Sequence, residues 1–428
     1  ANATFNSLAV NGTFVASSSY SLTIDGERSN GRALDIVGTF THGNGTITIT
    51  TAADTDLRWP SSSEAYNITI NHASCIARPT GDKPVIANNL TITAGEYNTL
   101  DSGGSTSHDL TVTGNTTLDG GSAGNEVARL NLNASTALLG SNNTSGGVNV
   151  SNGAGFYADA GSNVTMGFLD ANYDGNNEVK LLGTNTINSH SASTDRILKI
   201  TPGVIDAAGT SITITTATTG KTISCFDDTF ENLTLTPASS TTYNMVSSGI
   251  NIAGNLTINA NATLDTTTSN YPLTVLGTIT VAGTLTCNGS TINNGSASSS
   301  AGDLVWSGTI NLGTCTFNYY NGGSSNFNLG SCTLGSNTST VNIIARQTFA
   351  GRDTDLAPGS GNLHHLTFSE TNSVTGVFNL YGNTTIGGNL TINSGTTLST
   401  SGGSAGDNKS LTVTGDVDIS GTLTCNAS

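Results

Sequence analysis

The stretch Gly277-Thr-Ile-Thr-Val-Ala-Gly283-Thr-Leu-Thr-Cys-Asn-Gly289-Ser-Thr-Ile-Asn-Asn contains three short segments, each of which follows a glycine and alternates apolar with polar side chains. Such alternation is typical of a strand with one buried face. Glycine is expected at the corners between the segments, because it adopts backbone dihedral angles that are closed to other residues. The same six-residue repeat occurs again in Gly415-Asp-Val-Asp-Ile-Ser-Gly421-Thr-Leu-Thr-Cys-Asn. Both stretches therefore predict short strands joined by tight corners.

A longer repeat contains this six-residue repeat. The segment Asn-Leu-Thr-Ile, with one strand-like segment before it and a Leu-Thr-Val segment after it, occurs at Asn89, Asn255 and Asn389. Equivalent Leu or Ile positions follow one another at a near-constant step of about twenty residues, as from Leu233 to Leu256 and from Leu256 to Leu273. A three-sided β-solenoid requires such a step, because each coil must bring an equivalent strand back above its predecessor. The predicted fold is therefore all-β, a parallel β-solenoid with coils of about twenty residues. An antiparallel β-sandwich array is the alternative, because its hairpins alternate in the same way.

The composition excludes several classes of protein. The chain has 428 residues, of which 35% are hydrophobic, 10% are charged and 52 are glycine. Helix is disfavoured because Gly, Thr, Asn and Ser have low helix propensity, and disorder is disfavoured because the hydrophobic residues recur in alternating runs. The net charge of −16, with only 13 Lys and Arg, leaves no basic stripe for a phosphate backbone, so we expect no nucleic-acid partner. No run of about 18 apolar residues is present, so we expect no membrane insertion.

The repeats divide the chain into three expected regions. Residues 1–125 and 211–428 carry the solenoid repeats, and residues 126–210 are less regular and contain a candidate calcium loop. The first half of this loop presents alternate oxygen ligands as calcium loops do, but Leu181 stands where a bidentate Glu is expected. An Asx-rich turn is the alternative, and calcium is the one candidate cofactor. The candidate metal ligands are Asp170, Asn172, Asp174 and Asn176.

Roughly twenty N-x-S/T sequons predict N-linked glycosylation and an extracellular location. A chain rich in Asn and Thr produces many such sequons by chance, which is the alternative. The low charge and the acidic pI of about 4.4 agree with an extracellular protein. The predicted glycosylation sites are Asn2, Asn11, Asn44, Asn67, Asn89, Asn115, Asn133, Asn149, Asn163, Asn232, Asn255, Asn261, Asn288, Asn337, Asn383, Asn389 and Asn408.

The six cysteines contain no C-x-x-C pair, so neither a zinc site nor a redox motif is expected. Cys315 and Cys332 stand in the matching contexts Leu-Gly-Thr-Cys-Thr and Leu-Gly-Ser-Cys-Thr. If their separation is one coil, the two residues lie about 4.8 Å apart, which is close enough for a disulfide. Cys315 and Cys332 are therefore the disulfide candidates, and a ladder of buried free thiols is the alternative.

The chain is predicted not to be an enzyme, and no catalytic residue is assigned. It contains no G-x-S-x-G elbow, phosphate-binding glycine loop or H-E-x-x-H motif. Asp227-Asp228 and Arg196-Ile-Leu-Lys199 resemble the carboxylate pair and basic motif of pectin-hydrolase solenoids, but the basic motif comes first and no Gly-His-Gly lies between them. These aspartates are better explained as turn residues. The pair His364-His365 lies on a predicted strand, where neighbours face opposite sides, so we expect no metal site there.

The units Phe-x-x-Leu-Thr-Leu, Gly-Asn-Leu-Thr-Ile-Asn, Leu-Thr-Val-x-Gly and Gly-Thr-Leu-Thr-Cys resemble the strand repeats of large β-solenoid surface proteins of bacteria and archaea. These proteins include adhesin stalks, haemagglutinin-like passengers, and surface-layer or filament subunits. The resemblance covers most of the chain outside residues 126–210, and it implies architecture and a cell-surface location without implying an activity.

These observations lead to one functional expectation and two alternatives. We expect a non-enzymatic extracellular structural protein, a rigid element of a filament, sheath or adhesin stalk. Both chain ends fall inside repeat units without an evident polar cap, so we expect either that the chain is a section of a longer surface protein or that its partner is a second copy joined through open solenoid ends. The alternatives are a polysaccharide-acting β-helix enzyme and a carbohydrate-binding adhesin module. The latter would bind surface glycans, with Trp59, Trp306 and Tyr319-Tyr320 as its stacking residues.

Overall fold

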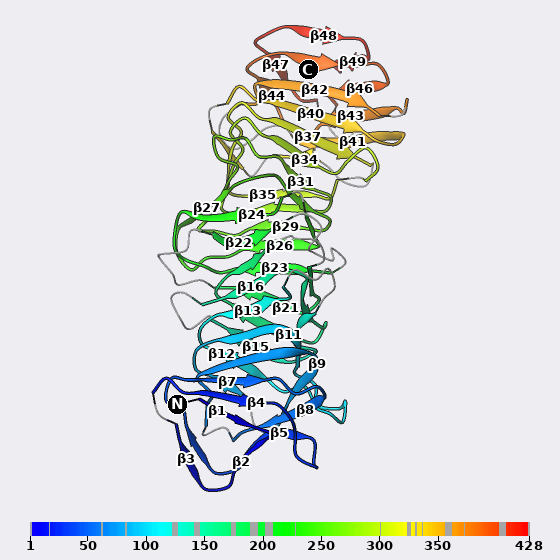
Figure 1. Ribbon diagram of the computed structural model, residues 1–428. Coiled ribbons are helices and arrows are strands. Elements are labelled where there is room, and N and C mark those ends of the chain that lie inside the picture. The colour runs from blue at the N-terminus through cyan, green and yellow to red at the C-terminus, as the bar shows by residue number, and fades with distance from the viewer. Residues whose placement is uncertain are drawn as a thin grey trace. The chain divides into compact units, whose positions relative to one another are not determined.

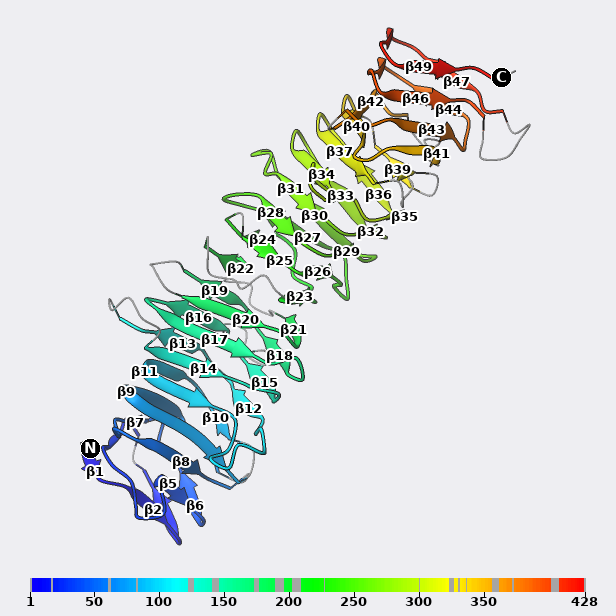
Figure 2. The same cartoon turned by 90° about the vertical axis from the view of Figure 1, so that its right-hand side faces the viewer.

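The computed structural model describes most of the chain. The described residues are 2–16, 18–60, 63–81, 84–121, 127–140, 146–172, 177–188, 196–201, 209–226, 228–299, 301–322, 327–329, 332–335, 337–355, 362–371, 373–401 and 408–426. They contain no helix and form parallel stacked coils, a β-solenoid of about 15 turns with 56% of residues in strands. The predicted fold class is therefore confirmed. Two compact units divide the chain, Ala1–Lys221 and Thr222–Ser428, and within each unit the strands of successive coils lie one above another (Figure 1 and Figure 2).

In the Ala1–Lys221 unit the strands form three sides, and every pairing between coils is parallel. The first side comprises β1 (Asn2–Phe5), β4 (Ser21–Ile24), β7 (Thr46–Ile49), β9 (Asn67–Thr80), β11 (Leu90–Asn98), β13 (Thr116–Asp119), β16 (Val148–Ser151), β19 (Leu169–Ala171) and β22 (Arg196–Ile200). The second side comprises β2 (Leu8–Val10), β5 (Arg32–Ile36), β8 (Asp54–Arg58), the distal halves of β9 and β11, β14 (Ala128–Asn131), β17 (Ala154–Ala158) and β20 (Glu178–Leu181). The third side comprises β3 (Thr13–Val15) with β6 (Thr39–Thr41), and then β10 (Val85–Ile86), β12 (Leu110–Val112), β15 (Thr136–Leu139), β18 (Asn163–Met166), β21 (Thr184–Ile187) and β23 (Ser211–Ile214).

The Thr222–Ser428 unit is built on the same plan, and β24 (Lys221–Ser224) lies at its start. One side comprises β26 (Asn232–Leu235), β29 (Leu256–Ile258), β32 (Ile279–Val281) and β35 (Leu304–Trp306). The next comprises β27 (Thr241–Met245), β30 (Ala262–Asp265), β33 (Thr284–Thr286), β36 (Thr309–Asn311) and β39 (Thr333–Leu334). The longest comprises β25 (Thr229–Phe230), β28 (Ile250–Ile252), β31 (Leu273–Val275), β34 (Thr291–Asn294), β37 (Thr316–Asn321), β40 (Thr340–Ala345), β42 (His365–Glu370), β45 (Leu390–Ile392) and β48 (Val417–Ile419). The later coils add β38 (Phe327–Asn328), β41 (Phe349–Asp355), β43 (Gly376–Leu380), β46 (Thr396–Ser399) and β49 (Thr422–Thr424), and β44 (Thr384–Ile386) with β47 (Leu411–Val413).

The core consists of in-register columns of aliphatic side chains. Leu233, Leu256 and Ile279 pair across successive coils, and all three are fully buried. On each of these strands the residues that alternate with the buried positions are Thr or another polar residue, and they point outward. This gives the alternating burial expected of a half-buried strand. Because a single coil has no hydrophobic interior of its own, stacking is what removes these columns from water.

The register corrects the predicted spacing. Leu256 pairs with Leu233 and with Ile279, so the step from 233 to 256 is one coil, as expected. Leu273, however, pairs with Ile250 and Ile292 on a different side. The step from 256 to 273 therefore leads around one coil and not up to the next.

The six-residue repeat is also explained by the succession of sides around a coil. Its three segments are β32, β33 and β34, which belong to three different sides. The six-residue repeat is therefore the spacing of consecutive sides within one coil. The glycines at its corners have a role other than the expected one: Gly283 does not adopt a positive φ angle, but a Cβ there would lie 2.2 Å from the carbonyl oxygen of Ala262 in the preceding coil. Close packing of one coil on another is what requires glycine at this corner.

Candidate functional site

Asparagine side chains cap the backbone of the following coil. Asn232 Oδ1 accepts a hydrogen bond of 2.8 Å from the backbone N–H of Asn255, and Asn255 Oδ1 accepts one of 2.8 Å from the N–H of Thr278. Asn389 Oδ1 accepts one of 3.0 Å from the N–H of Asp416 in the same way. The Asn of each Asn-Leu-Thr-Ile repeat thus satisfies a donor at the corner of the next coil, which would otherwise lack a partner in the ladder. The repeated Asn is explained by this contact.

These asparagines are also predicted glycosylation sites, and none of the predicted sites is buried. The capping bond uses Oδ1, whereas a glycan is attached to Nδ2, so the two roles are compatible. The exposed members of the set are Asn2, Asn11, Asn44, Asn163, Asn255, Asn261, Asn383, Asn389 and Asn408. The half-buried members are Asn67, Asn89, Asn115, Asn133, Asn149, Asn232, Asn288 and Asn337.

We expect Asn255→Ala to lower the free energy of unfolding of the Thr222–Ser428 unit by about 1 kcal/mol, because it leaves the Thr278 N–H without its acceptor. Asn255→Asp keeps an oxygen in the same place and should restore most of the loss. Thr257→Val is the matched control, because it removes the sequon and leaves the cap intact. Urea unfolding of the three variants checks the prediction, and equal losses for Asn255→Ala and Thr257→Val would contradict the capping role.

Charged residues gather on the second side of the Ala1–Lys221 unit. The Asp35 side chain is buried, and three guanidinium groups surround its carboxylate, with Nη1 to carboxylate distances of 3.2 Å for Arg28, 3.3 Å for Arg32 and 3.6 Å for Arg58. Asp56 lies in register with Arg32, and burial raises the pKa of its carboxyl while Arg32 and Arg78 act against the shift. The cluster ties the segment that follows β4 to two successive coils. Because the Asp35 carboxylate already has three cationic partners, its chemistry is that of a structural ion-pair network.

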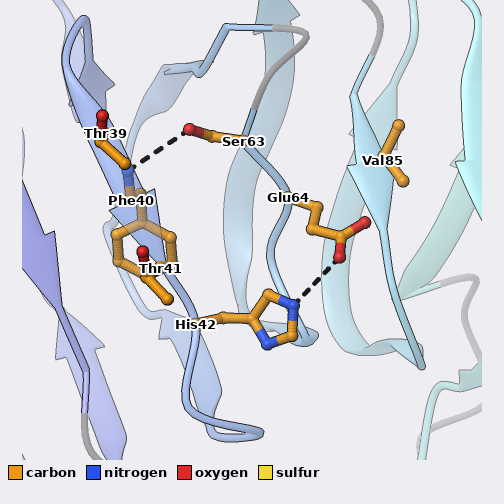
Figure 3. Close-up of a pocket in the computed structure, with 7 residues that line it drawn as sticks. All are labelled: Thr39, Phe40, Thr41, His42, Ser63, Glu64 and Val85. Atoms are coloured by element: carbon orange, nitrogen blue, oxygen red, sulfur yellow. Dashed lines mark hydrogen bonds and ion pairs between the residues drawn. The ribbon is translucent and has the colours of Figure 1, made fainter.

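A polar groove lies on the third side of the same unit, beside β6 (Figure 3). His42 Nε2 lies 3.1 Å from Glu64 Oε1, and the His42 ring stacks on the Tyr66 ring with centroids 5.3 Å apart. The Phe40 N–H donates to Ser63 Oγ at 3.3 Å. The groove has a volume of about 280 Å³ and is lined by Thr39, Phe40, Thr41, His42, Ser63, Glu64 and Val85.

The groove offers hydrogen-bonding groups of both kinds. The Glu64 side chain is 48% exposed and presents a carboxylate acceptor, while His42 Nδ1 is buried and has no hydrogen-bond partner among the described residues. Hydroxyl groups of Thr39 and Thr41 line the same wall. The arrangement fits a small polyol or saccharide better than an apolar ligand. Neither His42 nor Glu64 stands out in the sequence, although the spacing of 22 residues between them is one coil step and could have indicated the pair.

The candidate calcium loop is only partly described. Asp174 and Asn176 lie outside the described residues. Lys199 of β22 donates a hydrogen bond to Asn172 Oδ1 and lies 3.2 Å from Asp170 Oδ1, and β22 pairs in register with β19. The ammonium group of the next coil is thus hydrogen-bonded to Asn172 and ion-paired with Asp170. Among the described residues no group of three or more His, Cys, Asp or Glu side chains could hold a metal ion.

The structure does not join Cys315 to Cys332, and none of the six cysteines is in a disulfide. Thr309 pairs with Thr333, so one coil here is longer than the separation of the two cysteines. The Thr340 N–H donates to the Cys315 carbonyl at 3.0 Å, which places the equivalent corner of the next coil just before β40. Cys332 stands instead at the corner between β38 and β39. The two cysteines therefore occupy different corners, and the similar sequence around them reflects similar turns.

The predicted sugar-stacking aromatics are mostly in the core. Trp59 and Trp306 are 3% and 4% exposed and Tyr319 is fully buried, while Tyr320 is half-buried. Trp306 packs edge-on against Phe317 with ring centroids 5.4 Å apart. The three buried rings have no face available for a sugar, so three of the four residues are packing residues. They contribute to stability through burial.

The remaining candidates form no joint site among the described residues. Asp227 and the side chain of Arg196 lie outside the described part of the chain, and the Asp228 N–H donates to the Cys225 carbonyl in a turn at 2.8 Å. The expectation that His364 and His365 face opposite sides is wrong: their ring centroids are 4.3 Å apart, because His364 precedes β42 and is not part of the strand. His365 Nδ1 accepts the Asn389 N–H at 3.0 Å, the position that a capping Asn has in other coils.

Comparisons with known proteins found no matching family model, no matching curated protein and no matching solved structure. In the part of the chain that the structure describes, no helix is long and apolar enough to cross a membrane.

Proposed function

We propose that this chain is an extracellular structural protein, a rigid element of a cell-surface filament, sheath or adhesin stalk, and that it has no catalytic activity. The observation that carries the proposal is the set of side-chain hydrogen bonds between successive coils. In Asn293, Asn318 and Asn342 the side-chain amides bond to one another at 2.9 and 2.8 Å across three successive coils. Outward polar groups that bond to the neighbouring coil add stiffness to the stack, and stiffness is the property that a stalk or filament needs.

The extracellular location is supported by the surface chemistry. No predicted glycosylation site is buried, so burial does not block modification at any of these sequons. With only 10% charged residues, the surface relies on hydroxyl and amide groups for solubility. Glycans on Asn255, Asn383 and Asn389 would leave the hydrogen bonds that their Oδ1 atoms accept in place.

The coil formed by β47, β48 and β49 is the surface on which the proposed self-assembly can be tested. Val417 and Ile419 are 48% and 44% exposed, although their register partners Leu390 and Ile392 are fully buried. A further coil stacked on this surface would bury both side chains and pair the open strand edges. In the proposed assembly a second copy of the chain supplies that coil.

We expect electron microscopy of the purified protein to show filaments that lengthen with concentration. The double variant Val417→Lys with Ile419→Lys should remain dispersed, because two charges would have to be buried at the junction. Val305→Lys is the control, because Val305 is 52% exposed on the outward face of β35 and away from that surface. Dispersed short particles of the unaltered protein at every concentration would overturn self-assembly.

A second candidate function is the binding of a surface saccharide in the groove beside β6. The specific observation is the pairing of an exposed carboxylate with an imidazole and several hydroxyl groups around about 280 Å³. We expect binding on a glycan array to be lost in Glu64→Ala and kept in Glu231→Ala, which removes a carboxylate from the other unit. Equal binding by both variants would exclude the groove.

A further inference from the structure

Three side chains of complementary chemistry meet where β22 stacks on β19 in the Ala1–Lys221 unit. Asp170 lies on β19, Asn172 directly follows that strand, and Lys199 lies on β22 in the next coil. Lys199 Nζ donates a hydrogen bond to Asn172 Oδ1 and lies 3.2 Å from Asp170 Oδ1. One amine is therefore in contact with both a carboxamide and a carboxylate.

The register holds the three groups together. Asp170 pairs directly with Lys199, and the paired residues on either side of them are buried, so both side chains lie on the outward face of the ladder. The Asn172 N–H donates to the Val150 carbonyl of the preceding coil at 2.9 Å. The backbone of Asn172 is thus fixed from one coil while its side chain contacts the other.

Water is partly excluded from the contact. The Lys199 side chain is 16% exposed and that of Asp170 is 29% exposed. Asp170 Oδ1 is buried, and in the described part of the chain it accepts no hydrogen bond that would compete with its ion pair to Lys199. A proton that moves from Nζ to this oxygen replaces two charges by two neutral groups, and this change costs less where water is partly excluded.

An uncharged lysine amine is a nucleophile, and its target is close. The carbonyl carbon of Asn172 is one C=O bond, about 1.2 Å, from the oxygen that Lys199 Nζ contacts. The ladder holds amine and amide side by side, so their reaction is intramolecular, and such placement replaces a large part of the entropy cost of bringing two reactants together.

We propose that Lys199 and Asn172 form an intramolecular isopeptide bond that covalently joins two adjacent coils, and that Asp170 is the catalytic residue of this self-reaction. The Asp170 carboxylate takes a proton from the Lys199 ammonium, and the freed electron pair of Nζ attacks Asn172 Cγ to form the new C–N bond. The bond between Cγ and Nδ2 then breaks.

The reaction balances without an oxidant, a reductant or a second substrate. In two successive transfers Asp170 carries two protons from Nζ to the departing Nδ2 nitrogen, which leaves as NH₄⁺. The carboxylate is regenerated, and Nζ keeps one hydrogen as the N–H of the new amide. The product is one covalent link between residues that are 27 positions apart in the chain.

Mass spectrometry of the unaltered protein, produced without glycosylation and kept reduced, tests the link. The intact mass should be lower than that of the sequence by one molecule of ammonia. Trypsin should no longer cleave after Lys199, and the peptide 130–180 should be recovered joined to the peptide 197–221 through Asn172 and Lys199. The full sequence mass, or a loss of ammonia with normal cleavage after Lys199, would overturn the proposal.

Three variants separate the covalent bond from a simple ion pair. Lys199→Arg keeps a cation beside Asp170 but has no nucleophilic amine, Asn172→Ser has no amide, and Asp170→Asn has no proton carrier. All three should have the full mass of their sequences. Lys180→Arg is the matched control, because Lys180 lies on β20 on another side of the solenoid, and it should still lose one ammonia.

Stability gives a second measurement on the same variants. A link that closes a loop of this length restricts the unfolded chain, so the Lys199→Arg, Asn172→Ser and Asp170→Asn variants should unfold at a temperature several degrees below that of Lys180→Arg. Far-UV circular dichroism shows that each variant is folded before it is compared. A linked product in Lys199→Arg, or in Asp170→Asn at the level of the unaltered protein, would contradict the assigned roles.

Discussion

Phe317→Ala is expected to lower the free energy of unfolding of the Thr222–Ser428 unit by about 3–5 kcal/mol. Phe317 is fully buried between Ile292 of the preceding coil and Val341 of the following one. Its ring centroid lies 5.4 Å from that of Trp306 and 6.4 Å from that of Phe327. Removal of the ring leaves a cavity that two coils must share, and a solenoid coil has neighbours only above and below to fill it.

The measurement is urea unfolding followed by Trp306 fluorescence, which reports directly on the coils around the substitution. Val305→Ala is the control, because Val305 is the strand neighbour of Trp306 but is 52% exposed. It should change the free energy of unfolding by no more than about 0.5 kcal/mol. Similar shifts of the midpoint for both variants would mean that the interior of this unit is not closely packed.

The alternation of apolar and polar residues is sufficient to predict the fold class. It places Leu233 and Leu256 one coil apart on a buried face, and the structure confirms this pair. The same alternation cannot say which strand lies above which, because all three sides of a coil have similar sequences. It therefore assigns Leu273 to the next coil, although this residue lies on another side of the coil that contains Leu256. Register depends on corner lengths, and these vary.

Predictions of single sites depend on register and fail where register is misjudged. Similar contexts match Cys315 with Cys332, whereas the turn that ends at Cys315 lies against the turn that begins at Cys287. In the sequence Lys199 belongs to a basic motif, and the ladder places it against Asp170 and Asn172 instead. Contacts between coils join residues that are one coil apart along the chain, and local sequence carries no direct signal for them.

The glycines at the corners also allow one coil to approach the next closely. Gly12 and Gly38 precede the paired strands β3 and β6, so they occupy equivalent corners of two successive coils. A Cβ on Gly38 would lie 2.0 Å from the Gly12 carbonyl oxygen, whereas a Cβ on Gly12 would meet no atom within 4 Å. Neither glycine has a positive φ angle, so the backbone conformation itself accepts alanine at both positions.

Gly38→Ala is therefore expected to lower the free energy of unfolding of the Ala1–Lys221 unit by about 1–3 kcal/mol, because the coils must separate to admit the methyl group. Separation would weaken the bonds that the backbone N–H groups of Gly38 and Thr39 donate to the carbonyls of Val10 and Gly12, at 2.9 and 2.8 Å. Gly12→Ala should be neutral or slightly stabilising, since it only restricts the unfolded chain. Urea unfolding followed by Trp59 fluorescence compares the two. If both variants lost the same stability, a conformational requirement for glycine would explain the corners, and close packing between coils would not.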